Sequence, residues 1–239
     1  MLERFSQTDV KPELDGVTVA NAPVDYTTDE LVERVVVWVQ NIVGAQEFIR
    51  AKDDFYLLFG KVFPEDAFYE ARMNYFLEYF VFVRPITEAV NPAHAGKTPF
   101  VLFRESEAAV VQVPDNERGV THSLFQVVRH RKDSMVVRDL MTGTKHKIVP
   151  RHSETFCGFG KSDIFQGFVF STGDLSHVSH GVVIHPRKVE SIIKKTIKNV
   201  KKSLPDRSES LLRELAHLQI RAARHSHVNP KLIYNAPAR

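Results

Sequence analysis

The fold of this chain is decided by residues 123–143, SLFQVVRHRKDSMVVRDLMTG, near the middle of its 239 residues. Two runs rich in apolar residues, 123–130 and 135–140, flank the polar segment Arg-Lys-Asp-Ser, and this is the pattern of a β-hairpin. The same criteria predict further short strands at residues 100–103, 109–113, 145–149, 164–172 and 178–185. Successive short strands with tight connections predict an antiparallel β meander or a small barrel.

Helical patterns lie on both sides of this β region. A capping box at residues 27–30, TTDE, opens a helix whose apolar residues recur at helical spacing as far as Ile42. An aromatic stripe from Phe68 to Val83 predicts another buried helix face, which Pro85 ends. Two amphipathic helices are predicted after Pro186. The expected fold class is therefore α+β, with a helical N-terminal half, a central antiparallel β meander or small barrel, and two C-terminal helices.

These patterns divide the chain into five segments. Residues 1–26 show no clear period and contain two prolines, so we expect a flexible arm there. The remaining segments are a helical subdomain at residues 27–97, an antiparallel β subdomain at 98–186, basic helices at 187–228 and a tail at 229–239.

Charge is distributed unevenly between the two halves of the sequence. Residues 1–120 contain 20 acidic and 11 basic residues, a balance of −9. Residues 121–239 contain 9 acidic and 21 basic residues, a balance of +12, together with ten of the eleven histidines. This asymmetry indicates an acidic partner for the basic half, or docking of one half on the other. Two ordinary solvated faces are the alternative.

Composition excludes several classes of protein. No apolar stretch reaches the roughly 18–20 residues that a membrane span requires, and the first residues lack the pattern of a secretory signal. Cys157 is the only cysteine, which excludes an intrachain disulfide and a multi-cysteine metal cluster. We therefore expect a cytoplasmic protein without a metal or another cofactor, and the sequence does not indicate its oligomeric state.

Several stretches within residues 70–150 resemble a known family. They are residues 74–85, NYFLEYFVFVRP, residues 98–103, TPFVLF, residues 123–128, SLFQVV, and residues 137–143, VRDLMTG. They are similar to uncharacterised bacterial proteins that often carry a SEC-C metal-binding motif elsewhere in the chain. The resemblance implies a bacterial origin and supports the expected fold. The cysteines of that motif are absent here, so its metal chemistry does not carry over.

Histidine and cysteine side chains raise two further possibilities, zinc binding and nucleophilic catalysis. His177, His180 and His185 have the spacing HxxH-x4-H, but residues three apart on a strand point to opposite faces. We interpret them as surface or turn histidines rather than zinc ligands. Cys157 could act as a thiolate nucleophile with His152 as base, although a lone cysteine beside phenylalanine is usually a small buried residue. No catalytic residue is predicted.

Basic side chains form the strongest functional pattern. The predicted helix at residues 187–202 carries seven Lys and Arg against one Glu, and its outward face is expected to hold Lys194, Lys198, Lys201 and Lys202. The hairpin adds a basic tip. The predicted binding residues are Arg129, Arg131, Lys132, Lys194, Lys195, Lys198, Lys201 and Lys202. Such a surface binds anionic groups by salt-sensitive, sequence-independent contacts.

We therefore predict a non-catalytic binding or scaffolding module that engages an acidic protein or a nucleic-acid backbone. Two alternatives stay open. Arg129, Arg131 and Arg138 beside a small barrel suggest a cyclic-dinucleotide sensor of the PilZ type, although the RxxxR and (D/N)xSxxG motifs are absent. An enzyme that uses Cys157 is the other alternative.

Overall fold

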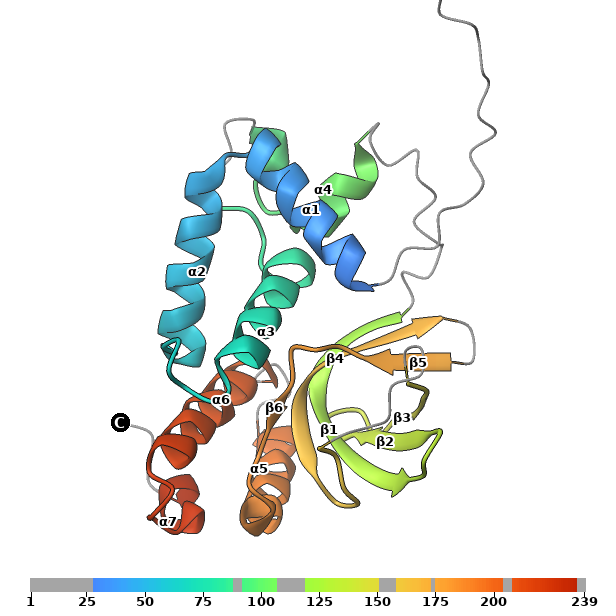
Figure 1. Cartoon of the computed structure of the whole chain (residues 1–239), viewed down its shortest axis with the longest axis vertical. Helices are drawn as coiled ribbons and strands as arrows, with labels where there is room; N and C mark the ends of the chain where they lie inside the picture. The colour runs from blue at the N-terminus through green and yellow to red at the C-terminus, as the bar shows by residue number, and fades with distance from the viewer. Residues whose placement is uncertain are drawn as a thin grey trace, which may run out of the picture.

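The computed structural model describes residues 28–87, 92–106, 119–150, 158–172, 175–203 and 208–235. A helical half, a β-barrel and a group of C-terminal helices follow one another along the chain (Figure 1). This arrangement confirms the predicted α+β fold class. The predicted arm at residues 1–26 and strand at residues 109–113 lie outside the described residues. Within the described ranges, no helix is long and apolar enough to cross a membrane.

An aromatic core holds the helical half together. Its elements are α1 (Thr28–Ile42), α2 (Ala45–Phe59), α3 (Tyr69–Phe82), a 3₁₀ turn η1 (Pro92–His94) and α4 (Pro99–Glu105). The side chains of Phe55, Phe59 and Tyr75 are fully buried, and the Phe55 and Phe59 rings stack with their centroids 4.8 Å apart. The aromatic stripe of α3 is therefore core, as its spacing predicts.

The helix α4 replaces the strand predicted at residues 100–103. Thr98 caps its first turn, because the hydroxyl oxygen accepts a hydrogen bond from the Val101 amide at 3.4 Å, and Pro99 occupies the first turn. Leu102 and Phe103 are buried in the helical core. Periodicity alone does not distinguish a short apolar strand from a short buried helix, and the cap favours the helix.

Six strands form the β region. They are β1 (Val120–His130), β2 (Met135–Asp139), β3 (Lys145–Ile148), β4 (Ile164–Thr172), β5 (Leu175–Val178) and β6 (Val183–Ile184). Five strands close into a barrel in the order β1-β2-β3-β5-β4, because β1 also pairs with β4. Only the β3–β5 pairing is parallel among the described strands. The first half of β1 pairs with β4 and its second half with β2.

Side chains alternate between the barrel interior and its outer surface. The interior contains Phe125, Val127, Met135, Val137, Ile148, Phe165 and Val169. Because successive residues of a strand point to opposite faces, Gln126 and Arg138 point outward. Strand pairing sets these two residues opposite each other, and it sets Arg138 opposite Lys145 on the next strand. A row of polar side chains therefore crosses the outside of the barrel.

The strand predicted at residues 178–185 is divided in two. β5 ends at Val178, and β6 contains only Val183 and Ile184. Gly181 lies between them against α3, where a Cβ atom would come within 2.5 Å of the Tyr75 backbone nitrogen. The chain leaves the barrel at this turn to contact the helical half, a tertiary event that strand periodicity does not indicate.

Three C-terminal helices pack beside the barrel (Figure 1). A 3₁₀ turn, η4 (Arg187–Val189), precedes α5 (Glu190–Ser203), which is followed by α6 (Ser208–Arg224) and α7 (Pro230–Asn235). Their apolar side chains share one cluster with Leu124 and Ile164 of the barrel. The predicted tail at residues 229–239 is thus partly helical, because Ile233 and Tyr234 are buried against this cluster.

The helix α3 joins the helical half to the rest of the molecule. Arg72 Nη2 donates to the Ala216 carbonyl of α6 at 2.8 Å. The Tyr75 hydroxyl lies 2.6 Å from His122 Nε2 of β1 and accepts a hydrogen bond from Gln166 Nε2 of β4 at 3.0 Å. These contacts fix the orientation of the barrel on the helices.

Candidate functional site

A groove of about 420 Å³ lies between α5 and the outer surface of β1 and β2. Its lining residues, which we call the basic groove, are Gln126, Arg138, Leu140, Lys194, Ile197, Lys198 and Lys201. The helix is oriented by Ile193 and Ile197, which are buried in the cluster shared with the barrel. Residues three and four apart share a helix face, so Lys194, Lys198 and Lys201 line the groove together.

A carboxylate is bonded to two of the residues that line the basic groove. Lys194 Nζ and Gln126 Nε2 each donate a hydrogen bond to Glu190 Oε1, at 2.7 Å in both cases. The hydrogen bond from Lys194 holds the pKa of the Glu190 carboxyl below its ordinary value. Glu190 is therefore an anion at neutral pH, and it neutralises Lys194.

The other three cations of the basic groove lack such a partner. Arg138, Lys198 and Lys201 are exposed, and they form no hydrogen bond or ion pair with any residue in the described part of the chain. Like charges three or four residues apart destabilise a helix by about 0.2–0.5 kcal/mol per pair, so the Lys198–Lys201 pair is unfavourable for folding. These cations are available to an external anion.

The cationic surface continues from the groove across the barrel. Strand alternation points Lys145 and Lys147 outward, and pairing sets Lys145 directly opposite Arg138. Arg129 and Lys147 lie on the two sides of Val136. We call this outer surface of β1, β2 and β3 the basic face, and its cations are Arg129, Arg138, Lys145 and Lys147.

The basic face has no acidic residue of its own. Asp139 is the single Asp or Glu in the three strands, and it is 1% exposed. Its Oδ1 atom accepts hydrogen bonds from the Ser123 hydroxyl at 2.6 Å and the Met141 amide at 2.7 Å. The Asp139 carboxylate thus supports the turn after β2. Arg138 therefore faces the like charge of Lys145 without compensation from these strands.

The structure separates the eight predicted binding residues into three groups. Lys194, Lys198 and Lys201 line the basic groove, and Arg129 belongs to the basic face. The remaining four are exposed outside both surfaces, in the β1–β2 turn and on α5: Arg131, Lys132, Lys195 and Lys202.

Several residues of these surfaces were not selected from the sequence. Arg138 was assigned only to the sensor alternative, and Lys145 and Lys147 were not assigned. Their signal was the alternation of Lys-His-Lys one tight turn after Arg138, which places all three cations on one side of a hairpin. Gln126 has no comparable signal, because its place in the groove depends on how α5 packs against the barrel.

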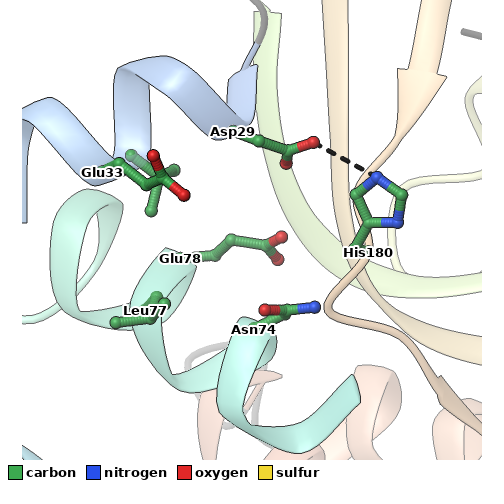
Figure 2. A pocket seen from close by; sticks show the side chains of 7 residues that line it. Asp29, Glu33, Asn74, Leu77, Glu78 and His180 are labelled. Carbon is green, nitrogen blue, oxygen red and sulfur yellow. Dashed lines mark ion pairs between the residues drawn. The ribbon is translucent and has the colours of Figure 1, made fainter. Parts of the chain in front are cut away.

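A second and smaller pocket, of about 80 Å³, lies between α1, α3 and the β5–β6 turn. Its lining residues, which we call the acidic pocket, are Asp29, Val32, Glu33, Asn74, Leu77, Glu78 and His180. Figure 2 shows Asp29 and Glu78 directed toward His180. Asp29 Oδ2 lies 3.2 Å from His180 Nε2, and Glu78 Oε1 accepts a hydrogen bond from the Gly181 amide at 3.2 Å. These contacts connect the barrel turn to the helical half.

The three histidines of the HxxH-x4-H pattern make separate contacts. His177 Nδ1 lies 3.2 Å from the Val149 carbonyl oxygen, while His180 belongs to the acidic pocket. His185 is buried, with Nδ1 2.8 Å from the Tyr234 hydroxyl, and burial lowers the pKa of His185 to about 3. Among the described residues, no three His, Cys, Asp or Glu side chains are grouped to hold a metal ion.

Comparisons with known proteins do not indicate a function, so the functional proposal rests on these surfaces. No family model, no curated protein and no solved structure matches the chain. The resemblance to SEC-C-associated proteins stays a prediction. Cys157 and His152, the pair of the enzyme alternative, lie outside the described residues.

Proposed function

We propose that this protein binds the phosphate backbone of nucleic acid through the basic groove and the basic face, without catalysing a reaction. The observation that carries the proposal is the surroundings of Arg138. This guanidinium faces Lys145 across the strands and two unneutralised lysines across the groove. Like charges placed directly opposite on a sheet are destabilising. A surface that costs folding free energy in this way supports binding of an external anion.

The surroundings of these cations favour nucleic acid over an acidic protein. Stable protein interfaces have an apolar or aromatic centre. The large apolar side chains exposed in the described residues are Val37, Ile42, Ile49, Leu57, Phe63, Ile184 and Leu232. None of them lies in α5 or in β1, β2 or β3. The cationic surface therefore lacks the apolar centre that an acidic protein partner would contact.

The barrel architecture supports the same location. OB-type barrels, which are five-stranded Greek-key barrels, bind oligonucleotides on the face of their second and third strands. The corresponding strands here, β2 and β3, carry Arg138, Lys145 and Lys147. The likeness is one of architecture and concerns the position of a site. The basic face carries no aromatic residue for base stacking, so the expected binding is independent of base sequence.

Fluorescence anisotropy with a labelled single-stranded oligonucleotide tests the proposal. Six cations without an acidic partner in the described residues contribute to the surface: Arg129, Arg138, Lys145, Lys147, Lys198 and Lys201. If all six contact phosphates, the logarithm of the association constant should fall with the logarithm of salt concentration with a slope of about −4.

A charge reversal with a matched control locates the binding surface. Lys198→Glu should weaken binding at least tenfold at about 0.1 M salt and reduce the slope by about 1. Lys195→Glu makes the same charge change on the same helix but outside the groove, so its effect should be much smaller. Equal losses in the two variants would contradict the proposed surface. Tighter binding of an acidic polypeptide than of the oligonucleotide would support a protein partner instead.

A small-ligand sensor is the second candidate, and the size of the basic groove favours it. A volume of about 420 Å³ is within the range of small-ligand sites, and an arginine lies at its edge. Titration with a cyclic dinucleotide discriminates the two candidates. Saturable binding that competes with the oligonucleotide and depends on Arg138 would favour the sensor.

A further inference from the structure

The basic groove and the basic face differ in shape and in charge density, and this difference identifies the part of a nucleic acid that each would contact. We infer that the basic groove binds the terminal phosphate of a nucleic-acid strand, and that the following nucleotides cross the basic face. This inference rests on the proposed function and adds to it the recognition of a strand end.

Charge is the first reason. Arg138, Lys198 and Lys201 converge on one concave volume of about 420 Å³. An internal phosphodiester carries a single negative charge, whereas a terminal phosphomonoester carries about −1.5 to −2 at pH 7 and offers three acceptor oxygens. A guanidinium can bind two of those oxygens with its fork, and the two ammonium groups can bind the third. Three clustered cations therefore match a monoester better than a diester.

The position of Glu190 is the second reason. The carboxylate of Glu190 bonds to Gln126 and Lys194, and both of these residues line the groove. Glu190 lies 11 residues before Lys201, a distance of about 16 Å along α5 at 1.5 Å per residue. A strand that continued past Lys194 would bring its next phosphate toward this anion. The groove is therefore closed electrostatically at the Glu190 end.

In the direction away from Glu190, cations continue from the groove onto the basic face and can bind further phosphates of the nucleic-acid strand. Arg138 lies at the boundary of the two surfaces, because it lines the groove and also pairs with Lys145 on the barrel. Lys147 follows on the same side of β3. A strand whose end is held by Arg138 and Lys198 thus meets Lys145 and Lys147 where it leaves the groove across β2 and β3.

The remaining groove residues indicate that phosphate, rather than a base, is recognised there. Leu140 and Ile197 form the apolar part of the lining, and no lining residue is aromatic. Base recognition in single strands depends on stacking against aromatic rings. The groove offers charge and no stacking surface.

The inference is tested with three single-stranded oligonucleotides of one sequence that carry a 5′-phosphate, a 3′-phosphate or hydroxyl groups at both ends. One phosphorylated form should bind the wild-type protein about tenfold more tightly than the hydroxyl form. Lys198→Gln should abolish this preference, and Lys195→Gln should retain it. Thermal melting of both variants verifies that they are folded. Glu190→Gln should reduce the preference by improving the binding of the hydroxyl form.

Each other outcome has a distinct meaning. Equal and salt-sensitive binding of all three oligonucleotides would overturn end recognition and leave the proposed function standing. No binding of any of them would overturn both. Competition by a mononucleotide as strong as that of the phosphorylated oligonucleotide would overturn end recognition in favour of a small-ligand site. A phosphate preference that survives in Lys198→Gln would show that the groove is not its origin.

Discussion

Arg84 of the helical half and Arg138 of the barrel are in opposite electrostatic surroundings. Arg84 is 5% exposed; its Nη1 atom donates to Glu47 Oε1 at 2.6 Å, and its Nη2 atom donates to Asp54 Oδ2 at 2.8 Å. Arg138 is exposed, lies opposite Lys145 and has no acidic partner among the described residues. A paired and buried cation joins segments of the fold, whereas a cation left among like charges opposes folding slightly and can bind a ligand.

The largest expected effect concerns the buried pair. Arg84→Ala leaves the buried carboxylate of Glu47 with the Thr87 amide at 3.0 Å and Arg50 at 4.0 Å as its remaining partners, so the free energy of unfolding should fall by about 3 kcal/mol. Lys198→Ala, on the exposed surface, should change it by less than about 0.5 kcal/mol. Urea denaturation of both variants measures the contrast. Similar losses in the two variants would remove the distinction between structural and ligand-binding cations.

A pH-dependent effect is expected at His185, where the C-terminal helices meet the barrel. Burial lowers the pKa of His185 to about 3, from 6.5 in the unfolded chain. The unfolded state therefore binds a proton below pH 6.5 that the folded state does not accept until pH 3. Stability from this group is complete above pH 6.5 and falls by about 2 kcal/mol between pH 6.5 and 5.

Urea denaturation at pH 7 and pH 5 measures this loss. In His185→Gln the residue no longer titrates, so the difference in unfolding free energy between the two pH values should be smaller by about 2 kcal/mol. An unchanged difference would contradict the neutral state of the buried imidazole.

The contact between the two regions is tested at Gly181. Gly181→Ala places a methyl group against the Tyr75 backbone nitrogen and the Glu78 carboxylate, and a backbone atom cannot rotate away. Overpacking of this kind should lower the free energy of unfolding by about 1–3 kcal/mol. Oligonucleotide affinity should be unchanged, because the basic groove is formed by other elements. A selective loss of affinity would show that the acidic pocket belongs to the binding surface.

The smallest expected effect gives the sharpest test of the comparison. Lys145→Thr removes the like charge opposite Arg138, so it should raise stability by about 0.5 kcal/mol while it weakens oligonucleotide binding. Lys147→Thr is the matched control, because Lys147 lies opposite Val136 and not directly opposite another cation. Both variants should lose affinity, and only Lys145→Thr should gain stability. A stability loss in Lys145→Thr would indicate that Arg138 and Lys145 do not repel each other.

Much of the fold follows from local patterns. The strand at residues 164–172 was predicted with its observed bounds, and the hairpin turn at residues 131–134 was predicted correctly, although β1 begins three residues earlier than expected. The alternation of apolar and polar residues and the composition of turns are patterns of a few residues, so they can be recognised in the sequence. One error arose from a local helix cap that was not recognised, and the others arose where distant contacts decide the outcome. Residues 100–103 fold as α4 under the Thr98 cap, Gly181 breaks a strand against α3, and Tyr234 orders a predicted tail.

The candidate site was predicted only in part, for a related reason. Helical spacing predicted one face of a helix with Lys194, Lys198, Lys201 and Lys202, of which the first three line the groove and Lys202 lies outside it. It did not indicate that Glu190 neutralises Lys194, or that Arg138 completes the groove from a strand about sixty residues away in sequence. Which charged side chains form pairs depends on which helices and strands pack side by side. The spacing of residues within one helix or strand does not indicate its neighbours.

By itself, the sequence determined the α+β class, the central hairpin and the cationic side of α5, because backbone sterics and the burial of apolar faces act over short stretches. The tertiary structure decided which cations form an ion pair with a carboxylate and which remain available. The packing of α5 on the barrel brings Arg138 close to Lys198 and Lys201, and it is this proximity of unneutralised charges, rather than their number in the sequence, that makes an anion-binding groove.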